Sequence, residues 1–382
     1  MSTLLTELDI KMLQVLREIG PSNISKVARN IGISRKALML RIKRMWSDPK
    51  FFLRMYISVY HTNLGLKKCV VFSEAKPGME NLLFDCLKVN DFWLYVCRSY
   101  GVGEGCTAVY AIPIEHCKEF ENFAREIRRL GVAKNVKVYW STCFQGGRIT
   151  SEWFDASQER WVFRWDDWVK EIQAQTIDLP YTLIEAKEYH NYADEIDLKI
   201  LEKLEANATR SLSMVAKSLG ISRQLVQYHY DNHIVAKNLL EGYEVFVMRY
   251  SDPSYVMVYF VINFHGYEDF AKFTRSLLNK SFVITMGKVY GENGLIVEVF
   301  LPIEEFRKFI DTLSAMVRMK LIRDYKYAIQ DLRIRCRQTI WPQFFDGNSW
   351  VYNHKDYIER LRQKVKSESF KGESKLGKLI TA

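Results

Sequence analysis

Five basic side chains cluster within ten residues near the start of the chain, and no acid lies among them: Arg35, Lys36, Arg41, Lys43 and Arg44. Guanidinium and ammonium groups contact phosphate oxygens and guanine edges in duplex DNA. Leu38, Ile42 and Met45 follow helical spacing and would face a core, so the opposite face would be basic. The segment therefore predicts a DNA-contacting helix with these candidate contacts: Ser34, Arg35, Lys36, Met39, Leu40, Arg41, Lys43 and Arg44.

A second segment has the same position in an internal repeat but different chemistry. Gln224 and Gln227 could pair with adenine, and the further candidates are Ser222, Arg223 and Tyr228. Residues 196–235 hold five basic and four acidic residues, so nonspecific attraction to DNA would be weak. This helix either reads bases or serves as a packing or partner surface.

Other residues that could do chemistry give no catalytic prediction. His229 and His233 are spaced i, i+4 and could hold a metal, but no nearby Cys or acid completes a set, so no metal site is expected. The glycines at 101, 103 and 105 precede a strand and indicate a hairpin turn, not a phosphate loop. We find no Ser/His/Asp or Cys/His constellation, and expect no cofactor.

An internal repeat organises the chain. Residues 8–45 align without a gap with residues 196–233, at an offset of 188, with eleven identities that include Gly32-Ile33-Ser34-Arg35 and Gly220-Ile221-Ser222-Arg223. Tyr100-Gly101 and Tyr290-Gly291 continue the repeat at nearly the same offset. Two units of about 190 residues therefore make up the protein.

The pattern of apolar residues in each unit predicts a helix-turn-helix followed by strand, helix, two strands, helix and strand. This order is the ferredoxin-like β-α-β-β-α-β plan. The fold class is α+β. The expected domains are a first helix-turn-helix (1–50), a first ferredoxin-like domain (51–145), an aromatic extension and linker (146–192), a second helix-turn-helix (193–240), a second ferredoxin-like domain (241–340), and an aromatic extension with a basic disordered tail (341–382). We expect the aromatic extensions to pack domains or subunits together.

Both units resemble the Lrp/AsnC family of feast/famine transcriptional regulators, in a tandem-duplicated form. The resemblance rests on Asp9 and Asp197 in a leucine-spaced first helix and on the Gly-Ile-Ser-Arg turns. It implies a winged helix-turn-helix that binds double-stranded DNA, and a ferredoxin-like (RAM-like) domain for pairing and effector binding. Carried over by position, it implies base or phosphate contact by Ser34, Arg35, Lys36, Met39 and Lys43. The sequence thus favours a sequence-specific transcriptional regulator, not an enzyme.

The alternative is a tetrapyrrole enzyme like the siroheme decarboxylases, which resemble Lrp/AsnC proteins and occur as paired or fused units. That family carries a His-Asn-Tyr-x-Arg type of segment on a hairpin strand, with histidine and arginine serving the tetrapyrrole carboxylates. The matching stretches, 91–100 and 280–290, contain no histidine, and Arg98 is their only guanidinium. The sequence therefore ranks this alternative second.

Composition sets the remaining expectations. The 382 residues are 48% hydrophobic, 26% charged and 14% aromatic, which excludes wholesale disorder. The formal charge is +10, and the two ends of the chain hold the excess. Seven cysteines without a C-x-x-C pair argue against disulfides and structural zinc. The longest apolar run, 255–264, is too short to span a membrane, and no leader is visible, so we expect a cytoplasmic protein. If only the first helix-turn-helix binds DNA well, a homodimer is needed to present two strong units, and we expect that homodimer.

Overall fold

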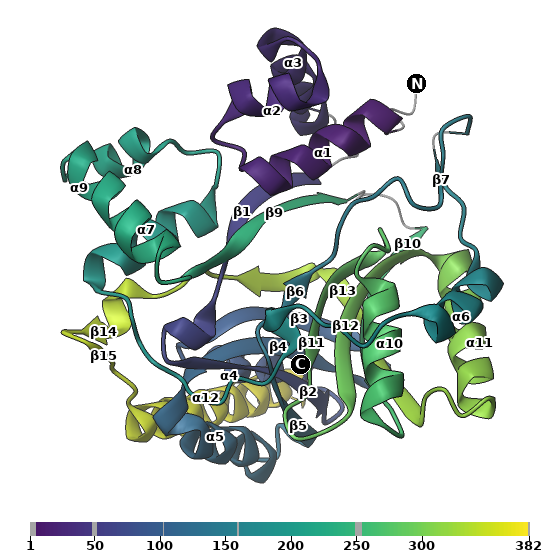
Figure 1. Cartoon of the computed structure of the whole chain (residues 1–382). Helices are drawn as coiled ribbons and strands as arrows, with labels where there is room; N and C mark the ends of the chain where they lie inside the picture. The colour runs from purple at the N-terminus through teal and green to yellow at the C-terminus, as the bar shows by residue number, and fades with distance from the viewer. Residues whose placement is uncertain (1–4, 48–51, 102, 159, 249–253, 381–382) are drawn as a thin grey trace.

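The computed structural model describes residues 5–47, 52–101, 103–158, 160–248 and 254–380. It is an α+β protein built from two tandem units, each a helix-turn-helix followed by a ferredoxin-like domain, as predicted (Figure 1). The elements of the first unit are α1 (Glu7–Ile19), α2 (Ile24–Ile31), α3 (Arg35–Ser47), β1 (Phe52–Val59), β2 (Leu66–Ala75), α4 (Glu80–Leu87), β3 (Trp93–Tyr100), β4 (Glu104–Pro113), α5 (Cys117–Arg129), β5 (Ala133–Ser141) and β6 (Gln145–Gly146).

The second unit repeats this order. Its elements are α7 (Glu195–Ala206), α8 (Leu212–Leu219), α9 (Arg223–His229), a π-helical segment (Tyr230–Val235), β9 (Leu240–Met248), β10 (Tyr255–Asn263), α10 (Tyr267–Leu277), β11 (Val283–Lys288), β12 (Gly294–Pro302), α11 (Ile303–Arg318) and β13 (Asp324–Arg337). The extensions add β7 (Phe154–Asp155), β8 (Arg160–Trp161) and α6 (Trp165–Ala174) after the first unit, and β14 (Phe345–Asp346), β15 (Ser349–Trp350) and α12 (His354–Ile380) after the second.

The two helix-turn-helix units form where their local sequence dictates. Gly32 and Gly220 end α2 and α8 in the left-handed conformation, which glycine adopts without a steric penalty. Thr6 and Asp194 begin α1 and α7 through capping boxes with Asp9 and Asp197, respectively. Asp9 and Asp197 are completely buried, so each carboxylate needs a partner inside the protein.

The strands of both units join into one nine-stranded sheet, in the order β5-β2-β4-β3-β13-β10-β12-β11-β6. The units meet at β3 and β13, where Tyr100 pairs with Ile329. The sheet curls until its edges approach each other: Thr142 N donates to Lys288 O at 2.9 Å, and Tyr290 N donates to Trp140 O at 2.9 Å. The concave face is thereby enclosed between the two units.

A separate antiparallel ribbon of β1 and β9 lies over this sheet and connects the helix-turn-helix units to it (Figure 1). Its register pairs Met55 with Val245 and Ile57 with Tyr243. One strand comes from each unit, so the ribbon is a second junction between the repeats.

Each aromatic extension packs against the opposite unit, which confirms its predicted role in joining domains. Trp168 of α6 lies in the second unit's core, where its ring centroid is 5.4 Å from Phe273 and its indole N–H donates to Ser276. Trp341 packs edge-on against Phe92 of the first unit, with centroids 5.0 Å apart. This reciprocal exchange ties the two units together.

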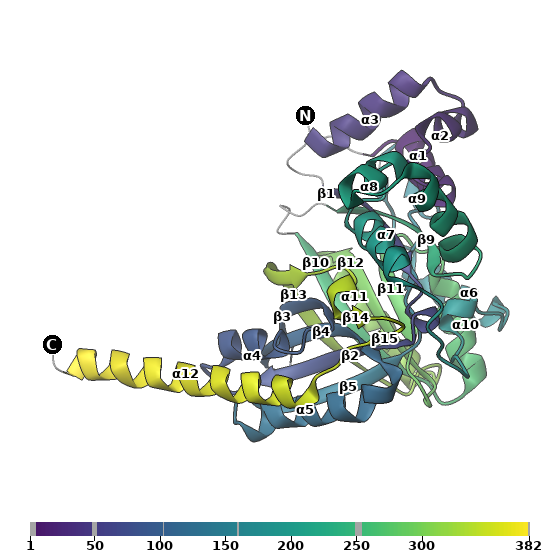
Figure 2. The ribbon, with the colours of Figure 1, turned by 90° about the vertical axis from the view of Figure 1, so that its left-hand side faces the viewer.

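Helix α12 runs to Ile380, through the segment for which the sequence predicted a disordered tail. Its first turns pack on the first unit: Tyr357 and Leu361 are buried, and Lys364 pairs with Asp85 of α4 at 3.0 Å. The helix then extends beyond the body of the protein (Figure 2). Among the described residues, no helix has the length and apolar character needed to cross a membrane.

Candidate active site

A cavity of about 200 Å³ lies between the concave face of the sheet and the β1–β9 ribbon. Both units contribute to its walls, including strands β1 and β2 of the first and β10, β12 and β13 of the second. Its ionisable lining residues are Arg54, Tyr56, His61, Lys68, Tyr95, Glu205, Glu244, Tyr259, Glu298, Arg335 and Arg337. So many ionisable groups around one cavity are characteristic of a binding or catalytic site.

Four of these side chains carry positive charge into the cavity: Arg54, Lys68, Arg335 and Arg337. Lys68 is 7% exposed, and its ammonium lies 4.9 Å from the centre of the Phe144 ring. Within the described chain, no carboxylate lies at ion-pair distance from this ammonium. Arg337 lies 4.0 Å from the carboxylate of Glu205 and 4.2 Å from the centre of the Tyr56 ring.

The three lining carboxyl groups do not fully balance these cations near neutral pH. Burial raises the pKa of Glu298 to about 7, although hydrogen bonds from Gln330 and Tyr259 favour its charged form. Burial also raises the pKa of Glu244 to about 7, against the opposing effect of Arg17, and raises the pKa of Glu205. Four cationic side chains therefore face three carboxyl groups, two of which have a pKa of about 7, so the cavity is net positive and can accept an anionic ligand.

His61 is the most unusual residue in the wall. It follows β1 and is 2% exposed, yet neither ring nitrogen makes a hydrogen bond to any residue that the structure describes. Burial and the nearby positive charge of Lys68 lower its pKa well below the usual value and outweigh a weaker backbone contact with Val59, so the ring is neutral at pH 7. Buried polar atoms normally have partners, and an unpaired imidazole in a cavity wall is therefore suited to meet a ligand.

A larger cleft, of about 800 Å³, adjoins this cavity at Glu244, which lines both. Glu244 pairs with Arg17 at 3.0 Å, and Arg17 also donates to the carbonyl oxygens of Gly146 and Gly147. Arg148 lines the same cleft. The Arg17–Glu244 pair thus lies where the cavity meets the wider cleft, whose charged lining residues are Arg17, Arg148, Glu18, Glu152, Glu241 and Glu244.

The residues predicted to contact DNA lie elsewhere, on α3 and at the start of α9, and none lines the cavity. Arg41 and Arg44 do not point freely outward: they pair with the buried carboxylate of Asp9, at 2.9 and 2.5 Å. Of the residues predicted to contact DNA, the following are exposed: Ser34, Arg35, Lys36, Met39, Leu40, Lys43, Ser222, Arg223, Gln224 and Tyr228.

Three of the predicted contacts make local hydrogen bonds. Ser222 caps α9 by accepting from Leu225 N at 3.1 Å, and Ser34 accepts from Ala37 N at 3.1 Å. Gln227, half-buried, donates to Asp231 at 2.7 Å. A role for any member of the set in DNA contact stays a prediction, as do the DNA partner and the homodimer.

Sequence reasoning missed the cavity residues because they come from both units. Arg335 and Arg337 alternate along β13, and this period of two was the available signal that both side chains face the same side of the sheet. Nothing in the linear sequence brings them to His61 or Arg54. Arg98, the guanidinium on the hairpin strand, pairs instead with Glu104 at 2.6 Å and lies outside the cavity lining.

No family model matches this chain, and no curated protein matches it. Among solved structures, siroheme decarboxylase NirDL is similar over 95% of this chain and 100% of its own, with a TM-score of 0.54 and 11% identity. A complex of the same enzyme with an iron-uroporphyrin III analogue is similar over 95% of this chain and 99% of its own, also with a TM-score of 0.54 and 11% identity. These likenesses show that the fold is shared.

Transcriptional regulators match only part of the chain. A Neisseria meningitidis regulator bound to L-Met covers 39% of this chain and 96% of its own, with 15% identity and a TM-score of 0.33. Escherichia coli AsnC covers 39% of this chain and 97% of its own, with 19% identity and a TM-score of 0.29.

The full-length comparison overturns two expectations from the sequence. The sequence favoured a transcriptional regulator and no enzymatic activity, but the structure that matches nearly the whole chain is that of an enzyme. Both interpretations are therefore wrong for the chain as a whole. The decarboxylase was ranked second because two hairpin segments lack histidine, whereas the fold brings His61 and the arginines into the interior from other strands.

Proposed function

We propose that this protein is an enzyme that binds a siroheme-like, polycarboxylated tetrapyrrole between its two units and decarboxylates it. The observation that carries the proposal is the cavity itself, whose walls hold Lys68, Arg335 and Arg337 together with the neutral ring of His61. The full-length likeness to siroheme decarboxylase supports it, because that likeness covers both units and therefore the junction that forms the cavity.

The residues fit such a substrate. Guanidinium groups bind carboxylates through paired, charge-assisted hydrogen bonds, and Arg54, Arg335 and Arg337 supply them on two different strands. The neutral His61 ring offers a nitrogen to the substrate iron or to a polar substituent. Tyr56, Tyr95 and Tyr259 add aromatic surface for a flat macrocycle.

The cavity alone holds only part of a macrocycle, because small-molecule sites usually measure about 300–1,000 Å³. The adjoining 800 Å³ cleft supplies the remaining space. We infer that the substrate occupies both, which requires the Arg17–Glu244 pair to separate. Arg17, released from Glu244, and Arg148 would then be available to further carboxylates.

The reaction would proceed without any oxidant. In a side chain R–CH2–COO⁻, the bond between the methylene and carboxylate carbons breaks, CO2 leaves, and the electron pair stays on the methylene carbon. A proton then converts this carbon to a methyl group. Glu298, with a pKa raised to about 7, is protonated in part of the molecules at neutral pH and is our candidate donor.

A binding titration tests the proposal. Iron-uroporphyrin III added to the full chain should shift its absorption spectrum and saturate at one macrocycle per chain. Arg335→Gln combined with Arg337→Gln should weaken binding about tenfold or more, because charge-assisted hydrogen bonds are lost. Arg98→Gln is the matched control, since Arg98 pairs with Glu104 outside the cavity. Absence of binding, or equal loss in the control, would refute the assignment.

A further inference from the structure

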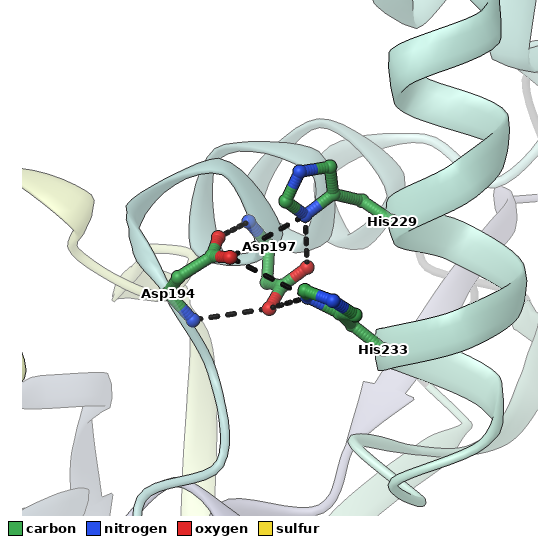
Figure 3. A group of neighbouring side chains, drawn as sticks. All are labelled: Asp194, Asp197, His229 and His233. Carbon is green, nitrogen blue, oxygen red and sulfur yellow. Dashed lines mark hydrogen bonds and ion pairs between the residues drawn. The ribbon is translucent and has the colours of Figure 1, made fainter.

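Four side chains that could bind a metal ion meet in the second helix-turn-helix unit (Figure 3). Asp194 and Asp197 come from the start of α7, whereas His229 ends α9 and His233 lies in the π-helical segment. One ligand atom from each lies within 4.8 Å of all the others. The sequence predicted no metal site because no nearby Cys or acid completed a set with the histidine pair. The fold supplies two acids from 32 to 39 residues earlier.

The four side chains lie close enough to surround one ion, with Asp197 meeting the two histidines through different oxygens. His229 Nδ1 lies 2.8 Å from Asp197 Oδ1 and 3.5 Å from Asp194 Oδ2. His233 Nδ1 lies 3.1 Å from Asp197 Oδ2 and 3.4 Å from Asp194 Oδ2. Zinc bonds of 2.0–2.2 Å to nitrogen and oxygen place tetrahedral ligand atoms about 3.4 Å apart. The His229–Asp197 and His233–Asp197 contacts are shorter than this, so an ion at the centre requires these ligand atoms to move apart.

The capping box orients both acids and leaves one oxygen of each outside it. Asp194 Oδ1 accepts from Ile196 N and Asp197 N, both at 2.9 Å, which leaves Asp194 Oδ2 facing the histidines. Asp197 Oδ2 accepts from Asp194 N at 3.0 Å, while Asp197 Oδ1 faces His229. Such supporting hydrogen bonds are what orients metal ligands in proteins.

The first unit provides an internal comparison. Asp9 holds the position of Asp197, and two guanidinium groups neutralise it, from Arg41 and Arg44. In the second unit, the position of Arg41 is taken by His229, and Asp194 brings a second acid where the first unit has Thr6. Among the ion pairs of the described residues, no Lys or Arg reaches Asp197. Asp197 therefore meets two histidines where Asp9 meets two guanidinium groups.

We propose that Asp194, Asp197, His229 and His233 bind one divalent transition-metal ion, with Zn²⁺ as the best match. Two imidazoles and two carboxylates suit zinc in type and number. The ion replaces the guanidinium groups of the first unit and joins the start of α7 to the end of α9. Access is open, since Asp194 is 41% exposed and His233 20% exposed, whereas Asp197 is fully buried.

Calorimetric titration of Zn²⁺ into the full, tag-free chain, stripped of metal by a chelator, tests the site. We expect one Zn²⁺ per chain with micromolar or tighter affinity, and a higher melting temperature on binding. His233→Gln should bind at least about tenfold more weakly. His265→Gln, which changes an exposed histidine outside the cluster, should bind as the wild type does.

Asp194→Asn separates loss of a metal ligand from loss of folding, because Asn caps a helix about as well as Asp does. It should keep the melting temperature of the metal-free protein and still lose at least about tenfold in Zn²⁺ affinity. Absence of Zn²⁺ uptake by the wild type would overturn the proposal and leave the cluster as histidine–aspartate ion pairs. Undiminished binding by folded Asp194→Asn and His233→Gln would overturn it as well.

Discussion

The guanidinium of Arg337, from the second unit, lies 4.2 Å from the ring centre of Tyr56, from the first. Both residues line the cavity, so this cation–π contact spans the junction at which the proposed substrate would bind. Burial raises the pKa of Tyr56 to about 12, despite the opposing charge of Arg337, and the phenol therefore stays neutral. The contact holds a planar cation in place without neutralising it.

The first prediction separates the charge of Arg337 from its shape. Arg337→Lys should weaken binding of iron-uroporphyrin III severalfold, because an ammonium keeps the charge but cannot stack or form paired hydrogen bonds. Arg337→Gln should weaken it about tenfold or more, as the charge is lost too. Absorbance titrations would give both affinities. Wild-type affinity in both variants would remove Arg337 from the site.

His61 should matter for ligand binding and little for stability. His61→Leu removes two ring nitrogens that have no hydrogen-bond partner among the described residues, so the free energy of unfolding should change by less than about 1 kcal/mol or rise. Binding of iron-uroporphyrin III should weaken, and its absorption spectrum should change. Urea unfolding and spectral titration measure the two effects. A large loss of stability with unchanged binding would make His61 purely structural.

Glu298 should make stability depend on pH. Its pKa is about 7 in the folded protein and near 4.5 otherwise, so the folded state holds an extra proton between these values. The contribution is full below about pH 4.5 and is lost as the pH rises through 7, a total of about 3 kcal/mol. Glu298→Gln should therefore lose less stability than the wild type between pH 5 and pH 8. Parallel urea midpoints for the two proteins would show that Glu298 titrates normally.

The exchanged aromatic extensions should carry much of the stability. Trp168 is fully buried in the second unit's core, and Trp168→Ala should cost about 3–5 kcal/mol in the free energy of unfolding. Trp46 on α3 is 49% exposed, so Trp46→Ala should change it by no more than about 0.5 kcal/mol. Chemical denaturation measures both. Equal, small effects would mean that the extension docks only weakly.

Local signals predicted the repeated architecture well. The glycines that end α2 and α8, the serine caps and the periodicity of apolar residues sufficed for two helix-turn-helix and two ferredoxin-like parts. These local signals could not predict which distant elements contact one another. The basic run on α3 looked free because the acid that binds Arg41, Asp9, lies 32 residues earlier on α1. The cavity likewise joins Arg54 to Arg337 across most of the chain.

The decarboxylation itself is the most direct test of the proposed function. The full chain would be incubated with siroheme under anaerobic conditions, and the tetrapyrrole recovered and weighed by mass spectrometry. The account predicts a product lighter by the mass of one or more CO2 molecules, formed by the wild type and by Arg98→Gln but not by Arg335→Gln combined with Arg337→Gln. Siroheme that binds to the wild type and is recovered unchanged would contradict the enzymatic assignment.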